Sequence, residues 1–159
     1  MVTHEKGFTL IELLIVIGLF ATLSMFITVN MLRPQISSSV STAGVTLVTD
    51  IKHQQLKSMV GSVPGGGIAP SHGVYFDTSG YTLFSGDSYI PASPNNFRID
   101  LANGVAFSNI TFPSSQLVFD RVSGEVSGFV SGSDSGSVEH SSGLVQKISI
   151  NRYGAIVLE

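Results

Sequence analysis

Residues 7–32 read GFTLIELLIVIGLFATLSMFITVNML, and this stretch decides what kind of chain it is. Phe8 to Leu32 form an apolar run in which Glu12 is the only charged side chain. A helix of about 25 residues at roughly 1.5 Å per residue can cross a hydrocarbon core of roughly 30 Å. A carboxylate inside such a helix costs on the order of 3 kcal/mol, so Glu12 needs a partner or a function. We expect residues 8–33 to form a transmembrane helix.

This run differs from an ordinary secretory signal peptide. Such a peptide has a shorter apolar stretch that is followed by a small-residue cleavage site. Here the run ends at Arg33 and Pro34 without such a site, and the small residue, Gly7, precedes it. A cut between Gly7 and Phe8 would leave the whole apolar helix at the new N-terminus.

Lys6 to Leu14 read KGFTLIELL. This stretch resembles the prepilin signature of type IV pilins and type II secretion pseudopilins, and the close resemblance covers residues 6–32. It implies that a prepilin peptidase removes residues 1–7 as a leader and that the same enzyme N-methylates the new Phe8 amine. It also implies that residues 8–33 form the core of a filament, in which Glu12 is the family's acidic fifth residue.

The chemistry of Glu12 agrees with an assembly role. A buried charge is tolerated when it is paired and hydrogen-bonded. Cleavage would create a positive amine at Phe8, about one helical turn from Glu12, and in a stack of parallel helices the Glu12 of one subunit could meet the Phe8 amine of the next. The alternative is that Glu12 lies near the membrane surface and reaches headgroup water.

Composition agrees with a small domain on a membrane anchor. A chain of 159 residues is expected to hold one domain, and its charged residues are 12% of the total, against a usual share of about 25%. The net charge is −3 and the basic residues are scattered, which makes the chain a poor nucleic-acid binder. There is no cysteine, so the head has no disulfide. Lys6 before the apolar run favours a cytoplasmic N-terminus, although Arg33 follows it.

An amphipathic continuation of the helix is predicted over residues 34–61. Pro34 cannot donate a backbone hydrogen bond, so we expect a kink there. Beyond it, an apolar stripe at helical spacing predicts a helix that ends near Val60 and packs on the head. The stripe consists of Ile36, Val40, Ala43, Leu47 and Ile51, and the side chains expected to face outward are Asp50, Lys52, His53, Gln54 and Lys57.

The rest of the chain, residues 62–159, reads as a β-rich head. Residues 63–67 predict a loop, and alternation predicts strands at 97–101 and within 105–112. Three hairpins are predicted from alternating strands around glycine-containing turns: 73–77 with 81–84, 116–120 with 125–130, and 144–150 with 155–158. The fold class is therefore α+β, a pilin-like long helix on a head with two small antiparallel sheets, one face of which the helix would cover. This order resembles the GspH/FimT-type minor pilins and pseudopilins.

Motifs for chemistry are scarce. Gly132–Gly136 places an aspartate where a nucleophile elbow needs serine, so it predicts a solvated loop. The histidines are scattered, and the spacing of Asp134 and Glu139 matches no calcium loop, although calcium binding there stays open. We expect no catalytic residue, no cofactor and no metal.

The sequence thus predicts a structural subunit in the bacterial cytoplasmic membrane, single-pass with its head outside, which then enters a pilus or pseudopilus. The resemblance implies several partners: the prepilin peptidase and N-methyltransferase, other pilin subunits, an inner-membrane platform protein with its assembly ATPase, and lipid before assembly. Two alternatives stay open. One is a DNA-uptake pilin or tip adhesin whose head binds a ligand, and the other is a plain single-pass protein with a sensory or enzymatic head.

Overall fold

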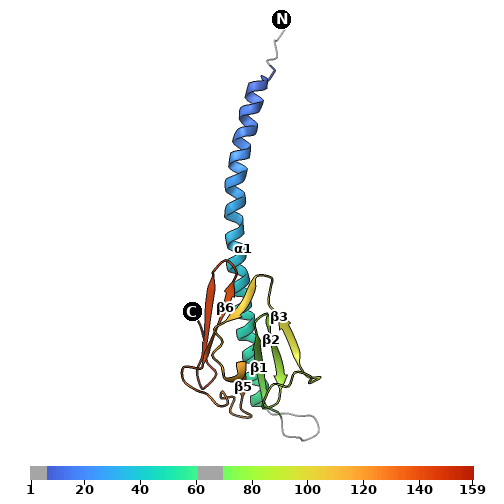
Figure 1. Cartoon of the computed structure of the whole chain (residues 1–159), viewed down its shortest axis with the longest axis vertical. Helices are drawn as coiled ribbons and strands as arrows, with labels where there is room; N and C mark the ends of the chain where they lie inside the picture. The colour runs from blue at the N-terminus through green and yellow to red at the C-terminus, as the bar shows by residue number, and fades with distance from the viewer. Residues whose placement is uncertain (1–6, 61–69) are drawn as a thin grey trace. The chain divides into compact units, whose positions relative to one another are not determined.

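The computed structural model describes residues 7–60 and 70–159, and within its long helix the side chains of residues 26–36 are not described. The predicted loop at 63–67 and most of the predicted leader lie outside the described residues. The chain divides into two compact units, Met1–Gln35 and Ile36–Glu159. Helix α1, Leu10–Val60, contributes to both units (Figure 1).

The first unit consists, where it is described, of residues 7–9 and the N-terminal part of α1. Its apolar side chains are exposed from Phe8 to Met25. Among the described residues, no helix is both long enough and apolar enough to span a membrane. The predicted transmembrane segment at residues 8–33 is therefore not shown by the structure. Pro34 lies within the bounds of α1, and the kink predicted there stays a prediction.

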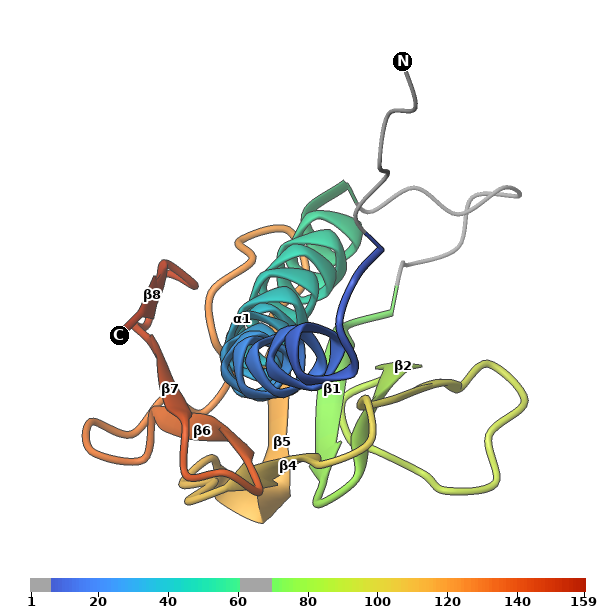
Figure 2. The ribbon, with the colours of Figure 1, turned by 90° about the horizontal axis from the view of Figure 1, so that it is seen from above.

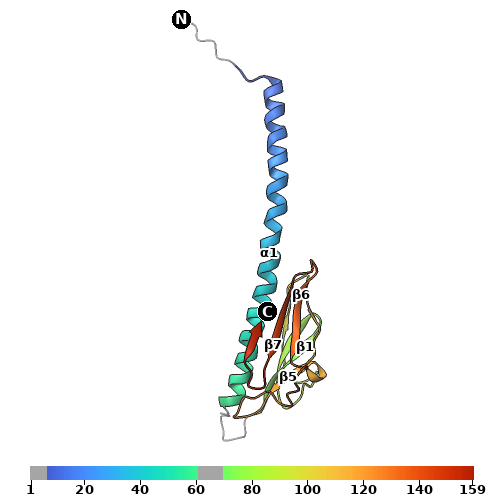
Figure 3. The same cartoon turned by 90° about the vertical axis from the view of Figure 1, so that its left-hand side faces the viewer.

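In the second unit, residues 36–60 of α1 pack against the head, with both sheets on one side of the helix (Figures 2 and 3). Val40, Leu47 and Ile51 are each no more than 2% exposed, which confirms the predicted stripe at these positions. The helix ends at Val60, as predicted. The expectation that Gln54 faces outward is wrong, because this side chain is only 2% exposed.

Two four-stranded antiparallel sheets form the head, as predicted. The first has the order β3-β2-β1-β5, and the second has the order β4-β6-β7-β8. A short 3₁₀ helix, η1 (Pro113–Ser115), precedes β5. The strands are β1 (His72–Asp77), β2 (Gly80–Ser85), β3 (Phe97–Asp100), β4 (Val105–Ser108), β5 (Gln116–Phe119), β6 (Ser135–His140), β7 (Val145–Ile150) and β8 (Ile156–Leu158).

Two of the three predicted hairpins are confirmed, namely β1–β2 and β7–β8. The third is only partly correct: residues 125–130 form no strand, but they meet the end of β5 at an antiparallel bridge between Phe119 and Val126, while the main partner of β5 is β1. The chain leaves the sheet there because Gly124 and Gly128 adopt positive φ angles of 67° and 63°. The solvated loop predicted at Gly132–Gly136 is also partly wrong, because its last two residues begin β6.

Aromatic rings join the two sheets beneath the helix. The Phe76 ring of β1 lies 5.4 Å from the Phe107 ring of β4 and 5.2 Å from the Phe112 ring, measured between centroids. Together with the helical stripe, these rings form one continuous core. The core fixes residues 36–60 of α1 on the head and holds the head's loops in place.

The C-terminal end of α1 is capped by residues from far along the chain. The Ser58 carbonyl accepts a hydrogen bond from the Val122 N–H at 3.0 Å, and its hydroxyl accepts one from the His72 N–H at 2.9 Å. One turn earlier, the Gln55 amide donates to the carbonyls of Gly124 (2.8 Å) and Tyr153 (2.9 Å). Carbonyl and N–H groups that a helix end or a turn would leave unpaired are thereby satisfied.

Candidate functional site

The predicted cleavage point is exposed and sterically open. The Phe8 side chain is 88% exposed. A Cβ added to Gly7 would meet no described atom within 4 Å. The described atoms around Gly7 therefore give no steric reason for glycine at this position. Recognition of Gly7 by a processing enzyme would explain why glycine stands here.

Thr9 and Glu12 form a capping box at the start of α1. The Glu12 Oε2 atom accepts hydrogen bonds from the Thr9 N–H at 3.0 Å and from the Thr9 hydroxyl at 2.8 Å. In return, the Glu12 N–H donates to the Thr9 Oγ1 atom at 3.3 Å. This reciprocal pattern satisfies two backbone donors that the first turn of a helix would otherwise leave unpaired.

The capping box gives Glu12 a partner inside its own chain. The pattern Thr-x-x-Glu was visible in the sequence and could have predicted it. The carboxylate's other oxygen, Oε1, makes no hydrogen bond within the described part of the chain. The cap therefore leaves half of the carboxylate available, and the predicted pairing of Glu12 with the Phe8 amine of a neighbour stays a prediction.

The helix that follows the cap is apolar on every side. Twelve large apolar side chains between Phe8 and Met25 are each at least 43% exposed. A helix that is apolar all round is normally buried, either in lipid or among other helices. Burying one such side chain contributes about 1.5–3 kcal/mol, so this surface strongly favours a partner outside the chain.

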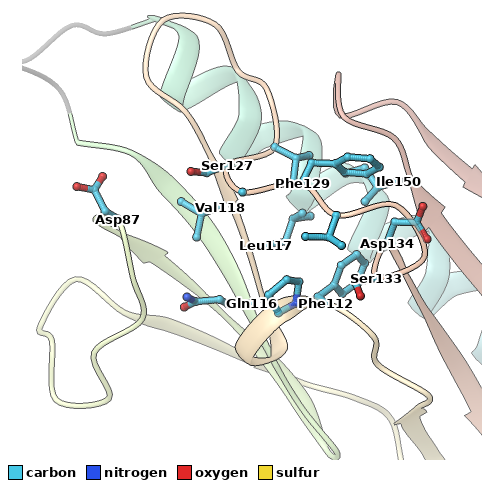
Figure 4. Close-up of a pocket in the computed structure, with 14 residues that line it drawn as sticks. Asp87, Phe112, Gln116, Leu117, Val118, Ser127, Phe129, Ser133, Asp134 and Ile150 are labelled. Atoms are coloured by element: carbon cyan, nitrogen blue, oxygen red, sulfur yellow. The ribbon is translucent and has the colours of Figure 1, made fainter.

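The head contains a small pocket of mixed polar and apolar lining, about 160 Å³ in volume, beside η1. Figure 4 shows Phe112, Leu117 and Ile150 gathered around it, with Phe129 from the loop that follows the isolated bridge. Asp134, one of the residues considered for calcium, lies at its edge. In the described residues, no group of three or more His, Cys, Asp or Glu side chains is placed to hold a metal ion. The pocket itself points to no particular ligand.

The basic residues of the head are mostly paired with acids. The Arg98 guanidinium lies 2.7 Å from a carboxylate oxygen of Asp100 and 3.2 Å from one of Asp77, and these hydrogen bonds, that of Asp100 first, raise the pKa of Arg98. Arg152 lies 3.2 Å from Glu125. Arg121 approaches Asp87 at 4.0 Å, which adds a third pair. These pairs reduce the positive potential that a polyanion would need.

Comparison with known proteins gives one match. Residues 3–28 match the family model described as the prokaryotic N-terminal methylation motif. No curated protein and no solved structure shows a significant match to the chain. The motif supports the type IV pilin and pseudopilin resemblance, and it implies processing by a prepilin peptidase and assembly with other pilins. Gly7, Phe8 and Glu12 all lie within the matched range.

Proposed function

We propose that this chain is a structural subunit, a minor pilin or pseudopilin, of a type IV pilus or a type II secretion pseudopilus. Prepilin peptidase would cut between Gly7 and Phe8 and methylate the Phe8 amine. The mature subunit would then join the filament through residues 8–33. The head would stand outside the cytoplasmic membrane, and the chain would have no enzymatic activity of its own.

The observation that carries this proposal is the methylation motif, which overlaps the start of an apolar helix whose side chains from Phe8 to Met25 are not covered by any described part of the chain. Before assembly, lipid would cover these side chains in a single-pass precursor. After assembly, sister helices would replace the lipid. Because the chain supplies no motor, a platform protein in the inner membrane and an assembly ATPase would extract it.

The capping box suggests how Glu12 serves assembly without an unpaired charge. Thr9 and Glu12 both belong to the mature chain, so the cap would survive cleavage. While the subunit is in lipid, Thr9 would hold one carboxylate oxygen of Glu12. The other oxygen would accept the Phe8 amine of an incoming neighbour, which would set the register between subunits.

Two features favour a minor subunit or pseudopilin over a major pilin. The chain has no cysteine, whereas many major pilins close a loop near their C-terminus with a disulfide. The two small sheets under one helix also have the layout expected for a GspH/FimT-type head. Labelling the subunit along sheared filaments would separate sparse positions from a continuous coat.

The N-terminus of the protein extracted from its native membrane tests this proposal. We expect intact-mass and N-terminal peptide analysis to show a chain that begins at N-methylated Phe8. The variant Gly7→Val should keep residues 1–7, while Gly18→Val, which makes the same change inside the helix, should be processed normally. A wild-type protein that retains Met1 would contradict the proposal and favour a plain membrane anchor.

The alternative, a DNA-uptake pilin or tip adhesin, makes a different prediction. DNA capture needs lysine and arginine gathered on one face. Arg98 and Arg152 are instead held by Asp100 and Glu125, which disfavours DNA as the ligand. Retardation of labelled duplex DNA by the full chain at low and at moderate salt would revive this alternative.

A further inference from the structure

A second pocket lies in the head between α1 and the edge of the first sheet. Its volume is about 430 Å³, within the range of roughly 300–1,000 Å³ that is usual for small-molecule sites. One face of α1 supplies one wall, and β2 with the start of β3 supplies the other. The lining residues are Asp50, His53, Gln54, Lys57, Leu83, Phe84, Asn95 and Phe97.

Gln54 is the feature that marks this pocket as a binding site. The residue is only 2% exposed, and its Oε1 atom has no hydrogen-bond partner in the described residues. Leaving a buried acceptor unpaired is unfavourable, and an apolar residue here would avoid that cost. A buried amide that lines a cavity and lacks a partner is therefore suited to a ligand that donates a hydrogen bond.

The pocket carries opposite charges at its two ends. Asp50 is fixed by a hydrogen bond of 2.5 Å from the Tyr81 hydroxyl, which leaves its other carboxylate oxygen for a donor. Lys57 lies seven residues further along α1, a rise of roughly 10 Å. The charge of Lys57 also acts on a neighbouring group: burial first, and then the charges of Lys57 and His53, lower the pKa of His72.

The third component is an aromatic surface. Phe97, at the start of edge strand β3, is 65% exposed, although it lines the pocket. Leu83 and Phe84 of β2 continue this apolar side behind it. An exposed ring offers a flat face, against which the aliphatic C–H face of a sugar ring can pack.

We propose that this pocket binds an acidic sugar, a pyranose that carries a carboxylate, as in a uronic acid polymer. The sugar carboxylate would pair with Lys57 at one end. Its hydroxyls, which both donate and accept hydrogen bonds, would reach the Gln54 and Asn95 amides and the free oxygen of Asp50. The C–H face of the ring would rest on Phe97. The site thus gives the head a ligand that the structural role of the filament does not require.

The composition of the lining favours a sugar over a peptide or a nucleic acid. Five of its eight lining residues are polar: four lie along the wall that α1 supplies, and Asn95 lies opposite, just before β3, which leaves no closed apolar pocket for a peptide side chain. A nucleic acid would need several phosphate-binding cations, whereas Lys57 is accompanied only by His53 and is offset by Asp50.

Direct binding to the full chain tests the proposal. The protein is held in micelles of a detergent without a sugar head group, and the probe is a trimer of galacturonic acid, titrated by calorimetry and by amide chemical shifts. We expect saturable binding, with shifts confined to residues around the pocket, and at least tenfold weaker binding of a galactose trimer. Absence of saturable binding, or equal binding of the galactose trimer, would overturn the proposal. Tighter binding of a triglutamate peptide would also overturn it, in favour of a peptide ligand.

Matched variants separate ligand contacts from effects on folding. Lys57→Gln and Phe97→Ala change an exposed charge and an exposed ring, and each should weaken binding of the galacturonate trimer about tenfold. Lys147→Gln and Tyr153→Ala make the same changes at exposed positions outside the pocket and should leave binding unchanged.

The variant Gln54→Met distinguishes a glutamine that binds a ligand from one that only supports the fold. It should raise the melting temperature of the free protein by a few degrees, because a buried unpaired acceptor is removed. The same variant should weaken trimer binding at least fivefold. A lower melting temperature together with unchanged binding would show that Gln54 supports the fold alone, and would overturn its assignment to the site.

Discussion

Thr9 lies between the predicted cleavage point and the acid of the apolar helix. Its hydroxyl and N–H both donate to Glu12, so it fixes the side-chain direction of that carboxylate. At an N-cap, an oxygen-bearing side chain is worth about 0.5–2 kcal/mol over an apolar one. The helix start therefore depends on a residue that the prepilin resemblance alone did not single out.

Replacing Thr9 by valine should loosen the first turn of α1. Valine has a similar shape but lacks the hydroxyl, so the Glu12 N–H loses its acceptor. We expect hydrogen exchange of the Glu12 amide, measured by NMR in micelles, to become about fivefold faster, which corresponds to about 1 kcal/mol. Thr9→Ser keeps the hydroxyl and should exchange as the wild type does. Equal exchange in all three proteins would contradict the capping role.

Val122 is held in a backbone conformation that suits it poorly. Its φ is +69°, in the left-handed region, which is rare for a β-branched residue, and its side chain is 76% exposed. The conformation directs its N–H at the Ser58 carbonyl at the end of α1. The strain is therefore associated with the capping of the helix.

Val122→Asn should stabilise the head by about 1 kcal/mol, because asparagine tolerates the left-handed region and can still donate its backbone N–H. We expect a rise of a few degrees in the melting temperature, followed by circular dichroism. Val145→Asn is the matched control: this valine is 50% exposed in β7, where a β-branched residue is preferred, and its replacement should lower the melting temperature slightly. A loss of stability in Val122→Asn would refute the assignment of strain.

At the scale of elements, one hydrogen bond joins α1 to the middle of the first sheet. The Tyr81 hydroxyl of β2 donates to Asp50, and Tyr81 is only 1% exposed. Burial, and then the hydrogen bond with Asp50 and its negative charge, raise the pKa of Tyr81. Ionising this tyrosine in the folded protein would place two negative groups side by side.

This bond predicts how the stability of the head changes with alkaline pH. Because the folded pKa of Tyr81 is raised, its contribution is present below the unfolded pKa of about 10 and is lost as the pH rises toward the folded value. The free energy of unfolding, measured with urea from pH 8 to pH 11.5, should therefore fall above about pH 10. Tyr81→Phe should flatten that fall, whereas Tyr153→Phe, which alters an exposed ring, serves as the control. An unchanged slope in Tyr81→Phe would contradict the prediction.

Local signals were sufficient for some strands and misleading for others. The β1–β2 and β7–β8 hairpins were predictable because each pairs neighbours in sequence around a short turn that contains glycine. Strand β6 was missed because its first residues, Ser-Gly-Ser, resemble a turn, and its pairing with β4 is non-local. Residues 125–130 alternate like a strand, but the positive φ of Gly128 is a backbone property that alternation does not report.

For the candidate sites, too, local sequence patterns predict some residues and miss others. The methylation motif that contains Gly7, Phe8 and Glu12 was predictable because the order of residues in the sequence is itself the motif, while the roles of these three residues stay predictions. Gln54 was not predictable, because a glutamine beside charged residues on a helix reads as solvent-exposed, and only the packing of α1 against β2 buries it. The sugar pocket brings together residues of α1, β2 and the start of β3, and no local pattern joins them.

At the scale of the whole molecule, the two units differ in how their apolar side chains are buried. The first exposes apolar side chains on all sides, while the second buries its own core around Val40, Leu47 and Ile51. The second unit has the contacts of an independent domain, whereas the described side chains of the first, from Phe8 to Met25, stay exposed. The solution behaviour of the chain should therefore depend on residues 8–35.

Removing that part of the helix should separate the two behaviours. A chain of residues 36–159 should be monomeric without detergent in sedimentation velocity and should unfold cooperatively with the helical signal of residues 36–60. The full chain in the same buffer should form large assemblies that detergent disperses. A truncated chain that aggregates, or that melts without a cooperative transition, would show that the second unit is not independent.

The hydrogen bond from Val122 to the Ser58 carbonyl has a consequence for biogenesis. The last turn of α1 is synthesised early, but its cap and most of the strands beneath it are made much later. A nascent chain that stops short of residue 122 would keep its helical stripe open to water, to proteases and to premature association. We therefore expect nascent chains of this protein to depend on a holding chaperone until the late strands are made.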